Sequence, residues 1–274
     1  MDLEPSSPVY IRIECSVLDA PSANMTDFSD TLVERLAAAD AVAVLTGAGI
    51  SAESGIPTFR DPDGLWEKFD PQELANVEAF LDNPELVQGW YRHRRQLVED
   101  AEPNDGHRAL AALDDHVPEC TVITQNVDDL HNRAGSRRVV ELHGNITHNY
   151  CMDCERPADA ERVDAAIQEG TPARCPECDG LIRPDVVWFG EMLPPDAMEQ
   201  AEAATREADV FLSVGTSAVV YPAAQLPIDA HGNGAYVAEI NPDRTGVTEE
   251  VDEAIRGPAG TVLPALVEAV ASVD

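Results

Sequence analysis

The chain has little positive charge. It carries 18 lysine and arginine residues against 51 aspartate and glutamate residues, a formal net charge of -33, and Lys68 is its only lysine. Such a surface repels nucleic acid in dilute buffer, so we do not expect direct nucleic-acid binding. Hydrophobic residues still make up 44% of the chain, which is enough for a folded core and argues against wholesale disorder.

Long apolar runs and an export signal are also missing. No stretch of about 20 apolar residues occurs, which predicts that no segment spans a membrane. The first residues, MDLE, include no basic residue and are not followed by a long apolar run, so we expect a cytoplasmic protein. A length of 274 residues suits one large domain, or one domain with insertions.

The excess of acidic residues indicates adaptation to high salt. At high ionic strength charges are screened within a few ångströms, so the self-repulsion of an acidic surface is tolerable there. In dilute salt the same repulsion would loosen the fold. We therefore expect a halophilic protein that loses structure or activity in dilute buffer.

Two short cysteine pairs stand 20 residues apart. Each pair has a two-residue gap, which brings two thiolates within reach of one metal ion. The pattern predicts one structural Zn²⁺ held by four cysteines: Cys151, Cys154, Cys175 and Cys178. Four thiolates leave no open position on a tetrahedral ion, so this zinc would hold a small module together and do no chemistry. Two disulfides are the alternative, which the absence of an export signal disfavours.

Short apolar runs predict the strands of a parallel sheet. The expected strands are residues 41–45, 121–124, 139–142, 210–214 and 235–240. Each run ends in polar or glycine-containing residues, and the carboxyl ends of parallel strands are where ligands bind in such folds. Helical segments at 105–115, 197–208 and 263–270 would supply the crossovers. We therefore predict an α/β protein built on a Rossmann-like parallel sheet.

Two stretches interrupt the alternation of strands and helices and are interpreted as insertions. The predicted parts are a poorly ordered N-terminal extension (1–27), a nucleotide-binding domain (28–60, 103–149 and 182–274), a helical insertion (61–102) and a zinc module (150–181).

A glycine loop, GAGISA at residues 47–52, directly follows the first predicted strand. It matches G-x-G-x-x-A, in which glycines allow a tight turn and let backbone amides approach a pyrophosphate. An ordinary dehydrogenase would continue into a second strand that ends in an acidic residue. Here residues 53–61 are rich in glycine and proline, which fits a mobile loop over the ligand. In that loop Arg60 would meet a phosphate and Phe59 would shield a reactive carbon from water.

The motif GAGISAESGIPTFR at 47–60 resembles the opening signature of the sirtuins, the NAD-dependent protein lysine deacylases. Further sirtuin-like motifs follow in family order around the two cysteine pairs: TQNVDDLH at 124–131, ELHG at 141–144, PDVVWFGE at 184–191, GTS at 215–217 and INP at 240–242. The similarity runs from about residue 31 to residue 270. It covers nearly the whole chain apart from the N-terminal extension.

The resemblance implies that NAD is a co-substrate. In the family, the acyl-lysine carbonyl oxygen attacks the carbon that bears nicotinamide, and the acyl group passes to the ribose. The products are free lysine, nicotinamide and O-acyl-ADP-ribose. His143 matches the catalytic histidine, a general base for a ribose hydroxyl. The implied partners are acyl-lysine proteins or peptides.

The resemblance also implies a set of NAD-binding residues. Asn126 and Asp128 would hold the nicotinamide ribose and carboxamide, and Gln125 would contact a ribose hydroxyl. The helical insertion would carry part of the cofactor loop. The expected NAD contacts are Gly47, Ala48, Gly49, Ser51, Glu53, Phe59, Arg60, Trp66, Gln125, Asn126, Val127, Asp128, Gly215, Thr216, Ser217, Asn241, Pro242 and Ala259.

Substrate recognition is expected at two places. The segment 187–191 resembles the one that pairs with an extended substrate backbone. Tyr91 and Arg94 stand at i and i+3 on one helix face. They resemble the Tyr-x-x-Arg of the sirtuin branch that removes malonyl and succinyl groups, where a phenol and a guanidinium clamp a distal carboxylate. An exposed basic helix face is the alternative. The expected substrate contacts are Tyr91, Arg94, Val187, Trp188, Phe189, Gly190 and Glu191.

Two other functions stay open beside deacetylation and removal of acidic acyl groups. One is a noncatalytic interaction module that binds NAD or ADP-ribose, and His143 argues against it because a sensor needs no base. The other is mono-ADP-ribosyl transfer, which would release nicotinamide without any acyl-lysine peptide.

Overall fold

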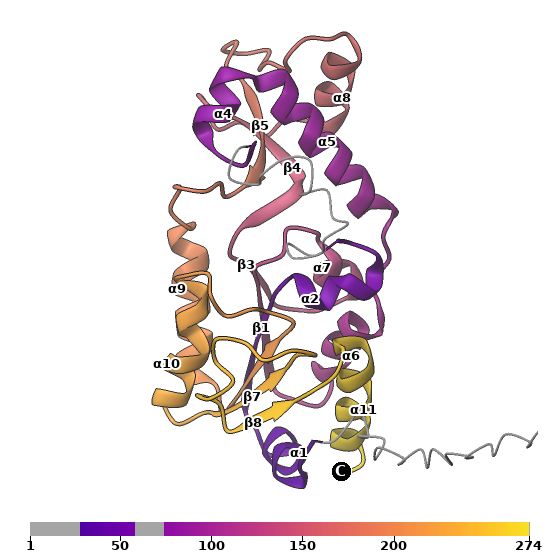
Figure 1. The fold of residues 1–274 in the computed structure, drawn as a ribbon, viewed down its shortest axis with the longest axis vertical. Helices are drawn as coiled ribbons and strands as arrows, with labels where there is room; N and C mark the ends of the chain where they lie inside the picture. Colours follow the sequence, from indigo (N-terminus) through magenta and orange to yellow (C-terminus); the bar gives the residue numbers. More distant parts are fainter. Residues whose placement is uncertain (1–27, 58–73, 274) are drawn as a thin grey trace, which may run out of the picture.

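The computed structural model describes residues 28–57 and 74–273 (Figure 1). The expected N-terminal extension lies outside the described residues. So do Phe59, Arg60 and Trp66, three of the predicted NAD contacts.

The larger part of the molecule is a six-stranded sheet in the order β3-β2-β1-β6-β7-β8. Every neighbouring pair in it is parallel, which confirms the predicted fold class. Its strands are β1 (Ala41–Thr46), β2 (Glu119–Thr124), β3 (Val139–Glu141), β6 (Val210–Val214), β7 (Tyr236–Ile240) and β8 (Glu253–Ile255). The edge strand β8 was not predicted, because it has three residues and only Ile255 is buried.

Helices cover both faces of this sheet (Figure 1). One layer holds α1 (Asp30–Ala37), α6 (Asp105–Leu113) and α11 (Ala259–Ala271), and the other holds α9 (Pro195–Glu207) and α10 (Leu226–Gly232). In β1, Val42 and Val44 pack with the first layer, whereas Ala43 and Leu45 pack with the second. Successive side chains of a strand point to opposite faces, so a strand covered on both sides needs a continuous apolar run.

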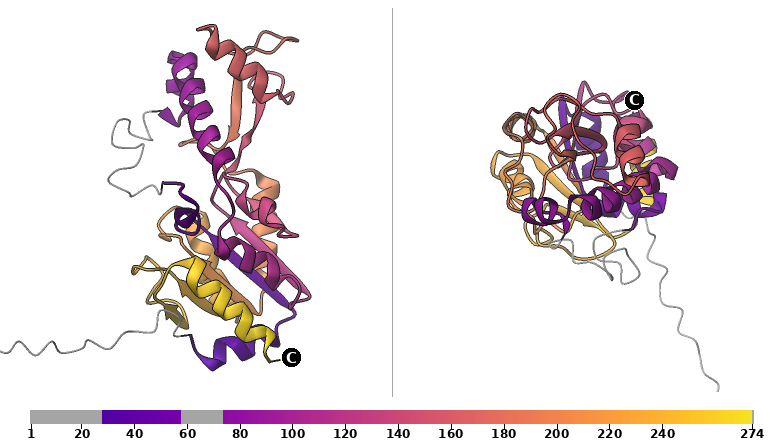
Figure 2. Two further views of the ribbon diagram at one scale, coloured as in Figure 1. Left: turned by 90° about the vertical axis from the view of Figure 1, so that its right-hand side faces the viewer. Right: turned by 90° about the horizontal axis from the view of Figure 1, so that it is seen from above.

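A smaller part is stacked on one end of the sheet domain (Figures 1 and 2). It contains two antiparallel strands, β4 (Gly144–Cys151) and β5 (Ile182–Val186), with the helices α4 (Val77–Asp82), α5 (Pro84–Asp100) and α8 (Ala160–Gln168). Its main core joins α4 and α5 to Ile146 of β4 and to Trp188, which follows β5.

Short helical turns complete the described chain: α2 (Ala48–Ser51), η1 (Ala52–Ser54), α7 (Leu130–Ala134) and η3 (Ala223–Gln225). Across residues 28–57 and 74–273, no helix combines the length and the apolar character that crossing a bilayer requires.

Candidate active site

The sheet reverses its winding between β1 and β6. From β1 the strand order runs through β2 to β3, whereas β6, β7 and β8 add on the opposite side. In open α/β sheets, ligands bind at such a switch point, beyond the carboxyl ends of the strands. The glycine loop follows β1 and Gly215 follows β6, so the two segments flank the expected crevice.

The glycine loop and Gly215 are in direct backbone contact. The Gly49 amide donates to the Gly215 carbonyl at 2.8 Å, and the Gly47 amide donates to the Val214 carbonyl at 3.1 Å. A Cβ atom on Gly49 would lie 2.7 Å from the Gly215 oxygen, closer than such atoms approach. Gly215 itself has a φ of 58°, in the left-handed region that favours glycine. These glycines are therefore required by loop packing, independently of any ligand.

A buried polar cluster lies beneath this loop. The Ser51 hydroxyl donates to Asp128 Oδ2 at 2.7 Å. Asn126 Nδ2 donates to Ser51 Oγ and to the Gly47 carbonyl, both at 3.1 Å. Burial raises the pKa of the Asp128 carboxyl group, and the bond from Ser51 opposes that rise. The fold thus joins four of the predicted NAD contacts, Gly47, Ser51, Asn126 and Asp128, in one network. Val127, between Asn126 and Asp128, accepts a backbone bond from Ile146.

Two buried histidines extend the cluster. His107 Nε2 lies 3.5 Å from Ser51 Oγ, and His131 Nε2 lies 2.9 Å from Thr46 Oγ1. Their ring centroids are 4.8 Å apart. Burial lowers the pKa of His107 to about 4 and that of His131 to about 3, so both rings are neutral at pH 7.

His107 was not among the predicted site residues. Its Nδ1 accepts from the backbone amide of Asn104 at 3.3 Å, and Asn104 Oδ1 accepts from the backbone amide of His107 at the same distance. The two bonds form a reciprocal cap at the start of α6. The sequence signal for this contact is an Asn-x-x-His spacing before a helical run. That spacing predicts the cap but not the neighbouring Ser51.

His143 stands at the carboxyl edge of the sheet, two residues after β3. Its Nδ1 lies 2.8 Å from the carbonyl oxygen of Gln125. A carbonyl only accepts, so Nδ1 carries the hydrogen and the neutral ring keeps its lone pair on Nε2. Burial lowers the pKa of His143, and the bond to Gln125 partly offsets this effect. The ring is therefore held as a neutral base with Nε2 able to accept a proton.

The β6 and β7 ends contribute further polar groups. Gln125 Nε2 donates to Thr216 Oγ1 at 2.9 Å, and Asn241 Nδ2 donates to the Thr216 carbonyl at 3.0 Å. Ser217 accepts a backbone bond from Gly246, while Pro242 is exposed. The predicted contacts after β2, β6 and β7 are thus linked around Thr216.

Glu53 is engaged with the start of α11. Its Oε2 accepts from the Gly260 amide at 2.7 Å, beside the buried Ala259 that begins the helix. A carboxylate at this position satisfies an otherwise unpaired amide and complements the helix dipole. Glu53, predicted as an NAD contact, therefore bonds the residue that follows Ala259, another predicted NAD contact, and the glycine loop is tied to α11.

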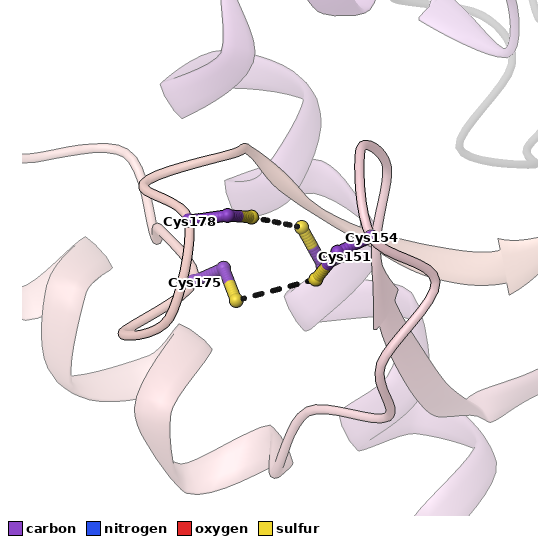
Figure 3. A group of neighbouring side chains, drawn as sticks. All are labelled: Cys151, Cys154, Cys175 and Cys178. Atoms are coloured by element: carbon purple, nitrogen blue, oxygen red, sulfur yellow. Dashed lines mark hydrogen bonds between the residues drawn. The ribbon is translucent and has the colours of Figure 1, made fainter.

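The four predicted metal ligands converge in the smaller part of the molecule (Figure 3). Their sulfur atoms all lie within 4.8 Å of one another, with 3.4 Å between Cys151 and Cys178 and 3.7 Å between Cys154 and Cys175. In a tetrahedral site with Zn–S bonds of about 2.3 Å, neighbouring sulfurs are about 3.8 Å apart. The cluster therefore fits one Zn²⁺.

The two cysteine turns have the same backbone form. The Glu155 amide donates to the Cys151 carbonyl at 2.9 Å, and the Asp179 amide donates to the Cys175 carbonyl at 3.0 Å. Glu155 and Asp179, each following the second cysteine of its pair, have positive φ values of 58° and 63°. Two matching turns that direct sulfurs to one point are typical of a metal-binding site. Such turns explain the two-residue gap in each cysteine pair.

The predicted substrate segment is anchored at both ends. The Val187 amide donates to the His143 carbonyl at 3.0 Å. At the other end, Glu191 forms a two-pronged ion pair with Arg183 at 2.6 and 2.8 Å, and accepts from the Trp188 amide at 2.7 Å. Between the anchors Trp188 is buried, whereas Phe189 is 51% exposed and Gly190 is exposed with a positive φ.

Tyr91 and Arg94 are neighbours on α5. The guanidinium carbon of Arg94 lies 5.7 Å from the centre of the Tyr91 ring and 4.8 Å from that of Trp90. Burial raises the pKa of Tyr91 to about 12, and the charge of Arg94 opposes this rise. The phenol is therefore protonated at pH 7 and lies beside a cation.

Comparison with known proteins defines the class of this fold and site. Residues 47–222 match the model of the Sir2 family. An NAD-dependent protein deacylase of Aquifex aeolicus (strain VF5) is 52% identical over 222 residues, which cover 81% of this chain and 92% of the relative. An NAD-dependent protein deacylase of Thermococcus kodakarensis (strain ATCC BAA-918 / JCM 12380 / KOD1) is 50% identical over 238 residues, covering 86% and 93%.

Solved structures agree with this assignment. A Sir2 homolog–NAD complex superposes with a TM-score of 0.83 at 44% identity, covering 90% of this chain and 96% of its own. A Sir2–p53 peptide–NAD⁺ complex gives 0.81 at 33% identity, covering 89% and 99%. The chain belongs to the Sir2 family, as its motifs predicted.

Proposed function

We propose that this protein is an NAD-dependent protein lysine deacylase. The observation that carries the proposal is the bond from His143 Nδ1 to the Gln125 carbonyl, which leaves Nε2 as a base at the carboxyl edge of the sheet. The relatives named NAD-dependent protein deacylase support the same activity. A noncatalytic NAD sensor has no use for a histidine held in this tautomer.

In this proposal NAD supplies an electrophilic ribose carbon and accepts the acyl group. His143 Nε2 takes the proton from a ribose hydroxyl, so that the hydroxyl oxygen can attack the acyl carbon. Its pKa, lowered by burial, keeps the ring neutral and ready to accept that proton at pH 7. Gln125 orients the ring through its carbonyl and contacts Thr216 through its amide, which links the base to the β6 side of the site.

The cofactor would lie across the switch point. We assign its phosphates to the glycine loop, Thr216 and Ser217, its adenosine ribose to Asn241, and its nicotinamide end to Asn126 and Asp128. The network of Ser51, Asn126 and Asp128 supports the last assignment, since it holds a carboxylate and an amide in fixed positions beneath the loop. Phe59, Arg60 and Trp66 stay predicted contacts.

We propose acyl-lysine peptides as the second substrate, bound along residues 187–191. A solved relative described as a Sir2–p53 peptide–NAD⁺ complex supports this class of substrate. The segment is fixed by the Arg183–Glu191 pair at one end and by the His143 carbonyl at the other. It would therefore present an ordered edge to an extended peptide directly beside the catalytic base.

We further propose that the acyl range includes malonyl and succinyl groups. A protonated phenol and a guanidinium side by side, as in Tyr91 and Arg94, form a charge-assisted site for a distal carboxylate. Acetyl-lysine would be accepted with less affinity, because it carries no distal carboxylate to contact Tyr91 and Arg94.

The deciding experiment supplies NAD with and without acyl-lysine peptide and follows nicotinamide by chromatography and deacylated peptide by mass spectrometry. Strict dependence of nicotinamide release on the peptide, with one O-acyl-ADP-ribose formed per lysine freed, is expected. Release without peptide would instead indicate mono-ADP-ribosyl transfer or NAD hydrolysis. NAD binding with no release would indicate a sensor.

We also propose that the enzyme works in a salt-rich cytoplasm, on the basis of its net charge of -33. Thermal unfolding and turnover are to be compared in molar KCl and at about 0.1 M salt, where the Debye length is about 10 Å. An unchanged melting temperature and full activity in dilute salt would contradict this.

We also propose that the chain has the four parts predicted from its sequence, namely the N-terminal extension, the nucleotide-binding domain, the helical insertion and the zinc module.

A further inference from the structure

Trp188 is held from several directions. Its backbone amide donates to Glu191 Oε2 at 2.7 Å. The guanidinium carbon of Arg183 lies 3.6 Å from the centre of its ring, and the Phe80 ring centroid is 5.0 Å away. Only 2% of the residue is exposed. A side chain clamped in this way has one orientation, so its indole N–H points in a fixed direction.

That N–H is directed at Tyr91. Trp188 Nε1 lies 2.9 Å from the Tyr91 hydroxyl oxygen. An indole nitrogen only donates, so the phenol oxygen must accept this bond. The hydroxyl hydrogen is not used by it and is left to donate to another acceptor. A hydroxyl that accepts a hydrogen bond is also polarised into a better donor.

We propose that Trp188 is a positioning residue for acyl specificity, which turns the Tyr91 hydroxyl hydrogen toward a carboxylate on the acyl chain. The inference rests on the proposed deacylase function and on the pairing of Tyr91 with Arg94. It adds that the preference for acidic acyl groups needs an indole at position 188, in addition to the Tyr-x-x-Arg pair on α5.

The surroundings of the phenol support this role. Tyr91 is 4% exposed, so water contributes little to orienting its hydroxyl. Burial keeps its pKa well above neutrality, which maintains the donor hydrogen. Because the indole nitrogen cannot accept a hydrogen bond, the hydroxyl hydrogen of Tyr91 needs an acceptor other than Trp188 Nε1. A buried acceptor beside Arg94 is then the partner that satisfies the hydroxyl most strongly.

The ion pair between Arg183 and Glu191 connects Trp188 to β5. Arg183 belongs to β5 and stacks on Trp188 while it bonds Glu191. β5 begins four residues after Cys178, the last metal ligand. The orientation of Tyr91 therefore depends on a continuous set of contacts that starts at the zinc module, passes through Arg183 and ends at Trp188.

The test compares kcat/KM for matched succinyl-lysine and acetyl-lysine peptides in wild type, Trp188→Phe, Tyr91→Phe and the double variant, at saturating NAD. Trp188→Phe keeps an aromatic ring but removes the donor. We expect it to lower the succinyl-to-acetyl ratio about five- to tenfold, the scale of one hydrogen bond between neutral groups. In the Tyr91→Phe background, the same change should leave the ratio as it was.

Two controls separate orientation from packing. Phe80→Leu loosens the contact with the Trp188 ring and keeps its N–H, so it should change both activities in parallel. Benzothienylalanine at position 188 replaces the N–H by sulfur and keeps the bicyclic shape. It should reproduce the selectivity loss of Trp188→Phe even where the smaller ring of that variant impairs folding.

The outcomes are distinct. Equal losses on both peptides for the benzothienylalanine variant, or a Trp188→Phe effect on the ratio that persists without the Tyr91 hydroxyl, would overturn the role of Trp188. An Arg94→Met variant that still prefers succinyl peptide would contradict the proposed carboxylate clamp of Tyr91 and Arg94. Absence of any peptide-dependent turnover in wild type would remove the deacylase function itself.

Discussion

The Nδ1 atom of His143 lies 2.8 Å from the carbonyl oxygen of Gln125, and this one bond fixes which ring nitrogen can act as a base. The tautomer follows from the chemistry of the acceptor, because a backbone carbonyl has no hydrogen to give. Beyond its proposed contact with the cofactor, Gln125 thus orients the ring of the proposed catalytic base through its backbone carbonyl.

The first prediction concerns His143 and pH. His143→Ala should abolish deacylation while NAD binding is retained. In wild type the neutral ring is the active form, and burial lowers its pKa below the ordinary value of 6.5. The rate should therefore be constant near pH 7 and fall only as the pH drops below about 6.5. The measurement is kcat/KM against pH with one acyl peptide. An acid limb above pH 7, or normal turnover by the alanine variant, would contradict the role assigned to the ring.

The second prediction tests the contact between the glycine loop and Gly215. Gly49→Ala places a Cβ atom 2.7 Å from the Gly215 carbonyl oxygen, so one of the two backbones must move. We expect a loss of about 1–3 kcal/mol in the free energy of unfolding and a raised KM for NAD. Gly89→Ala is the matched control, because a Cβ atom on that α5 glycine meets nothing within 4 Å. It should leave NAD kinetics unchanged and stabilise the helix by up to about 1 kcal/mol. Equal behaviour of the two variants would argue against the loop contact.

The third prediction concerns the acyl range. Arg94→Met removes the cation beside Tyr91 and should cut desuccinylation far more than deacetylation. A lost charge-assisted hydrogen bond of about 1.5–3 kcal/mol corresponds to a factor of roughly 10 to 150 in kcat/KM for the acidic acyl group. The readout is turnover of matched succinyl, malonyl and acetyl peptides by mass spectrometry. Parallel losses on all three peptides would mean that Arg94 serves the fold rather than the acyl group.

The fourth prediction follows from the buried histidine pair. The pKa values of His107 and His131 are lowered by burial to about 4 and about 3, against 6.5 in an unfolded chain. Below pH 6.5 the unfolded state therefore binds more protons than the folded one. The stability that these rings contribute is complete above pH 6.5 and is lost as the pH falls toward 4, with a slope of up to about 1.4 kcal/mol per pH unit for each ring.

Denaturant unfolding between pH 4 and pH 8 measures this slope. His107→Gln should make this slope shallower, because one of the two titrating rings is removed. An identical slope in wild type and the His107 variant would show that this ring does not titrate on unfolding as described.

The fifth prediction concerns the metal. One zinc per chain is expected by elemental analysis, bound by the four cysteines. Its removal by a chelator should lower the melting temperature and abolish peptide turnover, because β5 carries Arg183, which anchors the substrate segment. Cys178→Ser should act in the same direction, whereas Cys120→Ser, a buried cysteine outside the cluster, should retain the zinc. Full activity in a zinc-free preparation would refute the structural role.

The sequence predicted those parts of the fold that local patterns encode. The runs of β1 and β6 are apolar without interruption, and both are buried strands. The two-residue cysteine gaps gave the metal cluster for a similar reason, since a short turn joins each pair of sulfurs. By contrast, β8 was missed because it is short and half exposed, and α10 because it has only seven residues, with Pro227 in its first turn and Gly232 at its end.

Contacts between segments that are distant in the chain could not be predicted from the sequence. The motif around residue 188 predicts a substrate segment, but nothing in it indicates that an indole N–H meets a phenol 97 residues earlier in the chain. Glu53 was assigned to the cofactor, and only the fold reveals its bond to the first turn of α11. Such pairs depend on how whole elements pack, which residue type and spacing do not specify.

The interlocking of Gly49 with Gly215 has a consequence for how the protein is made. The entire glycine motif leaves the ribosome early, yet the carbonyl on which it rests belongs to the opposite half of the sheet, 166 residues later. A nascent chain that stops before β6 thus carries the signature of a nucleotide site without the surface that shapes it. Acquisition of dinucleotide affinity during synthesis would accordingly mark the moment at which the two halves join.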